Sequence, residues 1–198
     1  MNHLALLSGL VNRYFGLRHG RSEANQDGLV ASSPALGLSR FGLTEEGRRQ
    51  VREAVAASEL DGSVLIYCSD FLRARETAEI AREVLAARPP ATSPELRERF
   101  FGIHDGGSHS IYENVWARDR RNPAQTEDGV ESVHSVLERT TRLVRSLELL
   151  HREQTVLLIS HGDPLQILQC GFRRCCPSLH RTLPSLSTGA VRALSLAG

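Results

Sequence analysis

The sequence predicts an α/β fold, a three-layer sandwich in which helices cover both faces of a mainly parallel central sheet. Three short apolar runs, Tyr14–Leu17, Val64–Cys68 and Thr155–Ser160, have the length and composition of buried strands. Stretches with helical features separate these runs, and alternating strands and helices are typical of parallel sheets. The length of 198 residues suits one domain, so we expect residues 1–198 to form a single unit.

The composition argues against several classes of partner. With 24 basic and 23 acidic residues, the net charge is +1, which provides no overall field to attract nucleic acid or a membrane surface. No apolar run reaches the ~18 residues of a membrane span, and Met1–Leu10 lacks the features of a signal peptide. We expect this segment to be a loose lead-in to the first strand.

The four cysteines do not have the spacing of a zinc site. Cys68 lies in an apolar run and is expected to be buried, whereas Cys170, Cys175 and Cys176 are expected to be free thiols. Unpaired cysteines favour a reducing compartment, so we expect a cytoplasmic protein.

The first half of the chain carries the turn and capping residues expected between two strands. Gly28–Gly42 is rich in Gly, Ser, Ala and Pro and indicates a loop. Thr44 is the expected N-cap of a helix that has Val51 and Val55 on one face. Asp61–Gly62 is then expected to turn the chain into the second strand.

A second helix and a long connector follow that strand. The helix is expected to run from Ser69 to about Ala87 and to end at Arg88–Pro90. The stretch Thr92–Asn122 contains three glycines and predicts a mostly irregular connector. Connectors of this length are often functional.

The last part of the chain predicts one more helix, the third strand and a final strand. The helix is expected from Glu127 to about His151, with an apolar stripe that includes Val133 and Leu147. After the third strand, Pro164 is suited to the first turn of another helix. Ala190–Leu196 is expected to be the last strand.

Polar residues follow each of the three apolar runs. Arg18 and His19 follow the first, Ser69 leads to Arg73 after the second, and His161 follows the third. Because the carboxyl ends of parallel strands lie at one edge of the sheet, we expect these side chains to converge. Arginine matches the geometry of a phosphate, and histidine can act as a nucleophile or a proton carrier.

These residues lie within a series of ordered motifs. The chain resembles the histidine phosphatase superfamily, also called the phosphoglycerate mutase-like family, over roughly residues 11–194. The matching blocks are Arg18–Asn25, Gly42–Gly47, Ser69–Ala78, Leu96–Gly102, Gly129–Ser132 and Ser160–Asp163. The resemblance implies the phosphoglycerate mutase-like version of the predicted fold and a phosphoryl-transfer enzyme.

The resemblance also implies a role for each site residue. His19 would attack phosphorus and form a phosphohistidine, and Glu98 would first protonate the leaving alcohol and then activate water. Phosphoryl transfer requires charge on the equatorial oxygens to be neutralised, which Arg18, Arg73 and His161 would do without a metal ion. The substrate's phosphoryl oxygens would be bound by Ser22, Asn25 and the backbone N–H of Gly162. Neighbouring phosphate charge would raise the pKa of Glu98.

Other polar residues have alternative interpretations. Arg75 is expected to be solvated or salt-bridged, Asp163 to cap a helix, and Glu95, Glu131 and Arg139 to support the site. His104 and His109 suggest a solvated or substrate-facing loop more than a metal site. Arg120 and Arg121 could equally contact a substrate carboxylate or face water.

Within the family, two departures from the mutases favour a phosphatase. Ala24 stands where the mutases have a tryptophan, and only about 30 residues separate Glu98 from Gly129, where the mutases carry a longer insertion. We therefore expect a cofactor-independent phosphatase that acts on a small phosphorylated metabolite. The alternatives are a mutase primed by 2,3-bisphosphoglycerate, a protein phosphatase with an open lid, and a non-catalytic phosphate-binding or scaffold protein. The oligomeric state stays open, with a homodimer as one alternative.

Overall fold

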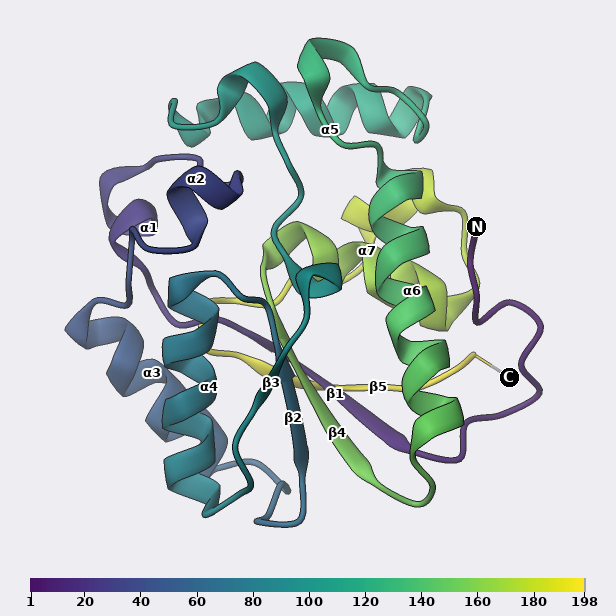
Figure 1. Ribbon diagram of the computed structural model, residues 1–198. Helices are drawn as coiled ribbons and strands as arrows, with labels where there is room; N and C mark the ends of the chain where they lie inside the picture. Colours follow the sequence, from purple (N-terminus) through teal and green to yellow (C-terminus); the bar gives the residue numbers. More distant parts are fainter. Residues whose placement is uncertain (198) are drawn as a thin grey trace.

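The computed structural model describes residues 1–197, in which a five-stranded sheet lies between two layers of helices (Figure 1). The strands follow the order β3-β2-β4-β1-β5, and all neighbours are parallel except β1 and β5. The strands are β1 (Arg13–Arg18), β2 (Leu65–Cys68), β3 (Ala91–Thr92), β4 (Thr155–Ser160) and β5 (Val191–Leu194). The predicted α/β fold with a mainly parallel sheet is confirmed.

Four long helices form the outer layers. Helices α3 and α4 cover one face of the sheet, and α6 and α7 cover the other (Figure 1). The α-helices are α1 (Glu23–Asp27), α2 (Pro34–Gly37), α3 (Glu45–Ala56), α4 (Leu72–Leu85), α5 (Tyr112–Arg121), α6 (Val133–Leu150) and α7 (Gly162–Arg173). Short 3₁₀ turns are η1 (Pro94–Leu96), η2 (Gly102–His104), η3 (His109–Ile111), η4 (Glu127–Gly129) and η5 (Pro177–Thr182).

Alternation along the strands divides the core between the two layers. In β1, Phe15 and Leu17 pack toward α3 and α4, whereas Tyr14 packs toward α6 and α7. β4 is buried on both faces, as expected for a central parallel strand. This pattern explains why the strands read as continuous apolar runs.

Local capping accounts for where two of the helices begin. The Thr44 hydroxyl accepts a hydrogen bond from the Gly47 N–H, so the predicted start of α3 is confirmed. The helix predicted from Glu127 instead begins at Val133, because the Ser132 hydroxyl caps it. Residues Glu127–Gly129 form a separate 3₁₀ turn.

The second predicted helix is shorter than expected at both ends. The chain remains extended at Phe71 before α4, and the Ser69 hydroxyl accepts a hydrogen bond from the Phe71 N–H. At the other end, Ala86 adopts a left-handed conformation and stops the helix, so the prolines are not what ends it.

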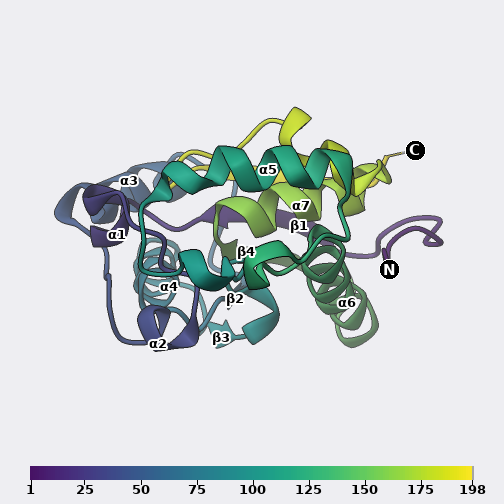
Figure 2. The ribbon, with the colours of Figure 1, turned by 90° about the horizontal axis from the view of Figure 1, so that it is seen from above.

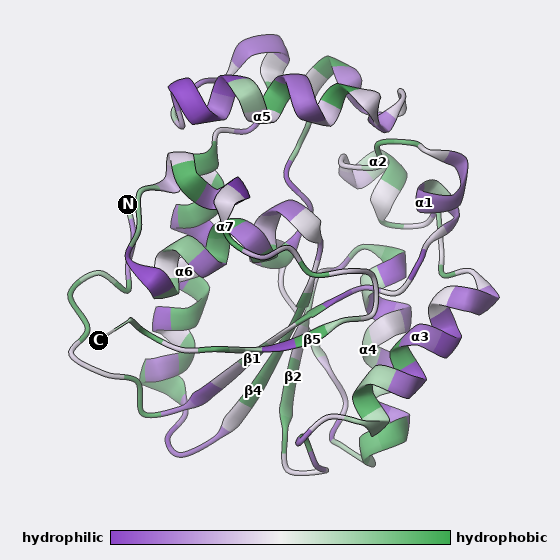
Figure 3. Ribbon diagram, turned by 180° about the vertical axis from the view of Figure 1, so that it is seen from behind, coloured by the Kyte–Doolittle hydropathy of each residue, from purple (hydrophilic) through white to green (hydrophobic). Residues whose placement is uncertain are grey.

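Three segments predicted to be loops or loose chain contain helices or residues packed in the core. The connector Thr92–Asn122 contains α5, and the loop Gly28–Gly42 contains the single turn α2. The segment Met1–Leu10 is not loose, because Leu4 is fully buried and packs in the core beside α6 and α7. The periodicity of α5 escapes a sequence search because the helix is largely hydrophilic (Figure 3) and buries only Val115 and Asp119.

Cys68 is buried as predicted, and the four cysteines form no disulfide within residues 1–197. Over the same range, every helix is too short or too polar to cross a membrane.

Candidate active site

The carboxyl ends of the central strands lie level with one another. Arg18 at the end of β1 pairs with Ser160 at the end of β4, and Cys68 at the end of β2 pairs with Ile159. Helix α5 lies over this edge of the sheet when the molecule is viewed from above (Figure 2). The space between the strand ends and α5 is therefore where the predicted site residues meet.

A cavity of about 290 Å³ opens at this edge. Seven of the eight predicted site residues line it: Arg18, His19, Ser22, Asn25, Arg73, Glu98 and Gly162. The eighth, His161, is fully buried behind the wall, with its ring centroid 5.0 Å from that of His19. The structure thus brings the two histidines and two arginines together.

The imidazole of His19 is held in one tautomer. Its Nδ1 lies 2.8 Å from the carbonyl oxygen of Gly20, which only accepts, so Nδ1 carries the proton. Its Nε2 accepts a hydrogen bond from Arg73 Nε at 3.1 Å. Burial and the charges of Arg73 and Arg18 hold the pKa of His19 well below its usual value. A neutral ring with a lone pair on Nε2 is the form that can act as a nucleophile.

Close packing around His19 requires glycine at the next position. A Cβ at Gly20 would lie 2.3 Å from the carbonyl oxygen of Gly47 in α3. The loop after β1 can therefore approach α3 only if residue 20 lacks a side chain.

Three buried nitrogen atoms around His19 have no hydrogen-bond partner within residues 1–197. They are Nε of Arg18, Nη1 of Arg73 and Nδ1 of His161. The rest of these side chains is anchored, since Arg18 Nη1 donates to the Leu186 carbonyl and Arg73 Nη2 donates to the Ala31 carbonyl. Buried arginine N–H groups without an acceptor cost free energy, so the arrangement suits an anion that accepts from them.

The surroundings of His161 do not favour the positive charge predicted for it. Complete burial, together with the charge of Arg73, holds its pKa well below the usual value. Its Nε2 lies 2.9 Å from the Ser69 hydroxyl. This shift favours the neutral imidazole, which can contribute a hydrogen bond, and the predicted positive charge of His161 stays a prediction.

Ser22 and Asn25 form the capping box of α1. The Ser22 hydroxyl accepts from the Asn25 N–H and donates to Asn25 Oδ1, which also accepts from the Ser22 N–H. These bonds leave the amide nitrogen of Asn25 as a donor at the cavity. The Ser22 hydroxyl is already occupied, so its direct contact with a substrate stays a prediction that the geometry does not favour.

Glu98 is held at the cavity by the neighbouring Arg99 N–H and by the side chain of Arg139. Its carboxyl oxygen accepts from the Arg99 N–H at 2.9 Å, and Arg139 donates to the backbone carbonyls of Glu95 and Glu98. Arg139 also pairs with Glu131 at 2.9 Å, so these two residues support the site as expected, whereas Glu95 contributes only its backbone carbonyl. Burial raises the pKa of Glu98 to about 7, with the charge of Asp163 as a second cause. The protein therefore raises this pKa without the phosphate charge that was expected to do so.

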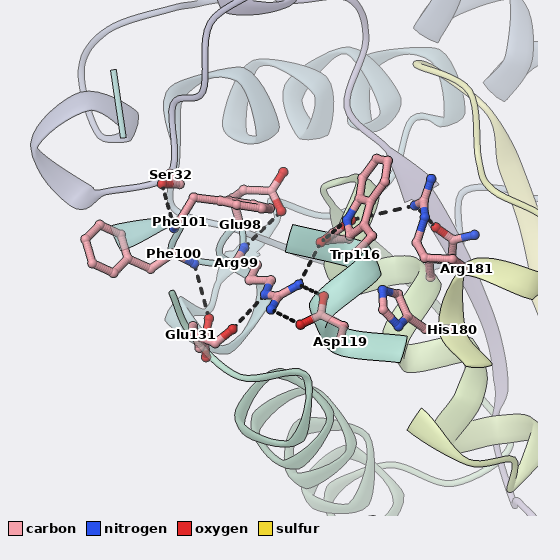
Figure 4. A network of polar contacts seen from close by, with 12 residues as sticks. Ser32, Glu98, Arg99, Phe100, Phe101, Trp116, Asp119, Glu131, His180 and Arg181 are labelled. Atoms are coloured by element: carbon pink, nitrogen blue, oxygen red, sulfur yellow. Dashed lines mark hydrogen bonds and ion pairs between the residues drawn. The ribbon is translucent and has the colours of Figure 1, made fainter. Parts of the chain in front are cut away.

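A buried ionic network that the sequence did not reveal links the segment of Glu98 and Arg99 to helices α5 and α7 (Figure 4). The fully buried Arg99 forms two hydrogen bonds of 2.6 and 2.8 Å with Asp119 of α5, and its Nη1 lies 3.4 Å from Asp163 of α7. Trp116 Nε1 lies 3.1 and 3.0 Å from the two Asp163 oxygens and donates to this carboxylate. Contrary to the prediction, Asp163 does not cap α7. Its carboxylate holds α5 over the cavity instead.

Helix α5 and η5 provide cavity residues that the sequence analysis missed, namely Tyr112, Trp116 and Arg181. The sequence left open the roles of His104, His109, Arg120 and Arg121, and of these four residues only His109 lines the cavity. His104 pairs with Asp128 at 3.2 Å, and Arg120 lines a neighbouring hollow. Arg75 is exposed and donates to the Leu38 carbonyl, which fits its expected solvated position.

No set of three His, Cys, Asp or Glu side chains within residues 1–197 is arranged to hold a metal ion. The charged groups around the cavity are the arginines and carboxylates described above. Their arrangement can bind an oxyanion, present a nucleophilic nitrogen and transfer a proton.

Comparisons with known proteins agree with this geometry. Residues 15–198 match the histidine phosphatase superfamily (branch 1). An adenosylcobalamin/alpha-ribazole phosphatase from Salmonella typhimurium is 30% identical over 165 residues, which cover 79% of this chain and 77% of the relative. A 2,3-bisphosphoglycerate-dependent phosphoglycerate mutase from Parvibaculum lavamentivorans is 30% identical over 193 residues, with coverage of 91% and 84%.

A solved structure shows the same architecture. The alpha-ribazole phosphatase from Shigella flexneri superimposes with a TM-score of 0.72 at 25% identity, covering 91% of this chain and 89% of that one.

Proposed function

We propose that this chain, which belongs to the histidine phosphatase superfamily, is a phosphatase that hydrolyses small phosphate monoesters with His19 as the nucleophile. The observation that carries this proposal is the set of unpartnered nitrogen atoms of Arg18, Arg73 and His161 around the neutral His19 ring. A phosphoryl group accepts from the two arginines while His19 Nε2 faces the phosphorus atom.

In the first half of the reaction, His19 Nε2 attacks phosphorus and the bond from phosphorus to the ester oxygen breaks. Arg73 releases the lone pair of Nε2 and donates to the phosphoryl oxygens instead. The Gly20 carbonyl stabilises the charge that develops on the ring, because it holds the Nδ1 proton. Glu98 gives its proton to the departing alcohol.

In the second half, the Glu98 carboxylate takes a proton from water, and this water attacks the phosphohistidine. The bond from phosphorus to Nε2 breaks, phosphate leaves, and His19 returns to its neutral form. A pKa of about 7 suits both steps, because Glu98 then loses and regains its proton near neutral pH.

The size of the cavity supports a small substrate. Helix α5 lies over the strand ends, and a cavity of about 290 Å³ beneath it favours a small substrate over a peptide. Ala24 lines the cavity at the position where the mutases carry a tryptophan.

A phosphoglycerate mutase primed by 2,3-bisphosphoglycerate is the second candidate, because a relative of equal identity has that activity. Both reactions share the phosphohistidine and differ in whether water or a second alcohol accepts the phosphoryl group.

The test measures phosphate release from a panel of monoesters that includes alpha-ribazole phosphate and 3-phosphoglycerate. It is run with a metal chelator, with and without 2,3-bisphosphoglycerate, beside His19→Ala and the surface control His134→Ala. We expect steady phosphate release that only His19→Ala abolishes. Conversion of 3-phosphoglycerate to 2-phosphoglycerate that depends on the bisphosphate would instead identify a mutase, and full activity of His19→Ala would refute the assigned nucleophile.

We also propose three properties of the whole protein, namely its domain organisation, its cofactor requirement and its cellular location. We treat residues 1–198 as one catalytic domain that needs no metal or other cofactor and acts in the cytoplasm. Four unpaired cysteines favour a reducing compartment. Cell fractionation and activity after dialysis against chelator test these points.

A further inference from the structure

The catalytic cavity adjoins a second hollow between α5 and η5, which we call the α5–η5 groove. The groove has a volume of about 480 Å³ and is lined by Glu113, Trp116, Ala117, Arg120, Ser178, Arg181 and Thr182. Trp116 and Arg181 line both spaces. A substrate whose phosphate lies at His19 can therefore extend past these two side chains into the groove.

Arg181 at this junction is a cation whose charge is only weakly neutralised by nearby acidic residues. Its guanidinium carbon lies 3.5 Å from the centroid of the Trp116 ring, and its Nη1 donates to Gln166 Oε1. Its single ion pair within residues 1–197 is a 3.7 Å contact with Asp163. The Asp163 carboxylate already pairs with Arg99 and accepts from Trp116, so it compensates Arg181 only in part.

Arg120 adds a second positive charge to the lining of the α5–η5 groove. Arg120 is exposed, and it forms no ion pair or side-chain hydrogen bond with any other residue in the described part of the chain. Glu113 is the one acidic residue in the lining, against two arginines. An anion in the groove would meet a net positive charge.

Two stacked aromatic rings lie at the junction, where Tyr112 lines the catalytic cavity and Trp116 lines both spaces. Tyr112 and Trp116 lie one turn apart on α5, with ring centroids 5.3 Å apart and an angle of 18° between the rings. These rings offer apolar contact to a carbon skeleton, and the Arg181 guanidinium against Trp116 favours a charged end there.

We propose that the α5–η5 groove binds the part of the substrate remote from the scissile phosphate, and that Arg181 recognises a second anionic group there, a carboxylate or a further phosphate. This proposal rests on the proposed phosphatase function and extends it to the class of substrate. Arg181 is thus a specificity-determining residue, and the substrate is a phosphate monoester with a second negative charge on its alcohol portion.

The experiment compares 4-carboxyphenyl phosphate with its methyl ester, two substrates with similar leaving groups that differ in the remote charge. The measured quantity is the ratio of kcat/KM for the acid to kcat/KM for the ester. We expect the wild-type enzyme to prefer the acid. We also expect Arg181→Gln to lower the ratio about tenfold, mainly through KM, because a charge-assisted hydrogen bond is lost. Arg121→Gln, an exposed arginine that lines neither space, is the control and should leave the ratio unchanged.

A wild-type ratio of one, or a ratio that Arg181→Gln does not change, would overturn the groove proposal while hydrolysis of the ester sustains the phosphatase. If neither compound is hydrolysed, the proposed function fails and binding decides about the groove. Trp116 is the single tryptophan, so its fluorescence reports binding directly. Tighter binding of the acid that is lost in Arg181→Gln supports the groove site, and equal binding by both proteins excludes it.

Discussion

Replacing Glu98 by glutamine should lower activity and raise stability, and the gain in stability should depend on pH. Glutamine keeps an oxygen that can accept from the Arg99 N–H, but it has no proton to give and no charge to lose. Burial raises the pKa of the Glu98 carboxyl from 4.5 to about 7. Folding therefore favours the protonated carboxyl.

The direction of the effect follows from this raised pKa. A carboxyl with a higher pKa in the folded state contributes stability below the unfolded pKa of 4.5 and loses it as the pH rises toward 7. A shift of this size corresponds to at most about 3 kcal/mol, and water in the cavity screens part of it. We expect Glu98→Gln to be about 1 to 3 kcal/mol more stable than the wild type at pH 8.5, and within about 1 kcal/mol of it at pH 5.

Urea unfolding at both pH values measures the difference, with Glu95→Gln as the control. Glu95 is in the same segment, but its side chain pairs with Arg142 at the surface. The control should show no gain at pH 8.5. A second assay follows turnover, where Glu98→Gln should slow phosphate release while substrate binding is largely kept. An equal stability change at both pH values would show that Glu98 does not titrate as described, and unchanged turnover would remove it from the mechanism.

Three further changes test the fold and the network. Gly102→Ala should destabilise the protein by more than about 1 kcal/mol in urea unfolding, since residue 102 has a φ of +58° and a Cβ there would lie 1.9 Å from the Asp128 carbonyl oxygen; equal stability would contradict this geometry. Arg99→Met should cost about 3 to 5 kcal/mol because it leaves buried carboxylates without their cation, and adding Asp119→Leu should restore part of the loss; a double variant that is less stable than the single one would argue against the pairing. Thr44→Ala should cost about 1 kcal/mol through the lost cap of α3 and leave phosphatase activity unchanged, which a parallel activity assay checks.

Features that depend on residues close together in the sequence could be predicted from the sequence. Apolar runs located β1, β2 and β4, because central parallel strands are buried on both faces. The order of strands and helices then placed Arg18, His19 and His161 at one edge of the sheet. Thr44 correctly predicted the start of α3, whereas the sequence did not lead us to expect Ser132 as the cap of α6.

Only the tertiary structure decided the electrostatic state of the site and the shape of its cover. The neutral form of His161 is favoured because the packed protein around it removes water, which no motif states. The partners of Arg99 lie 20 and 64 residues away in the chain, and Trp116 meets Asp163 across 47 residues. The buried Arg99–Asp119 ion pair and a small apolar cluster around Val115 together hold α5 over the cavity, so the helix does not need a long apolar stripe. Local patterns determine strands and caps, whereas burial and charge pairing depend on which distant segments the fold brings together.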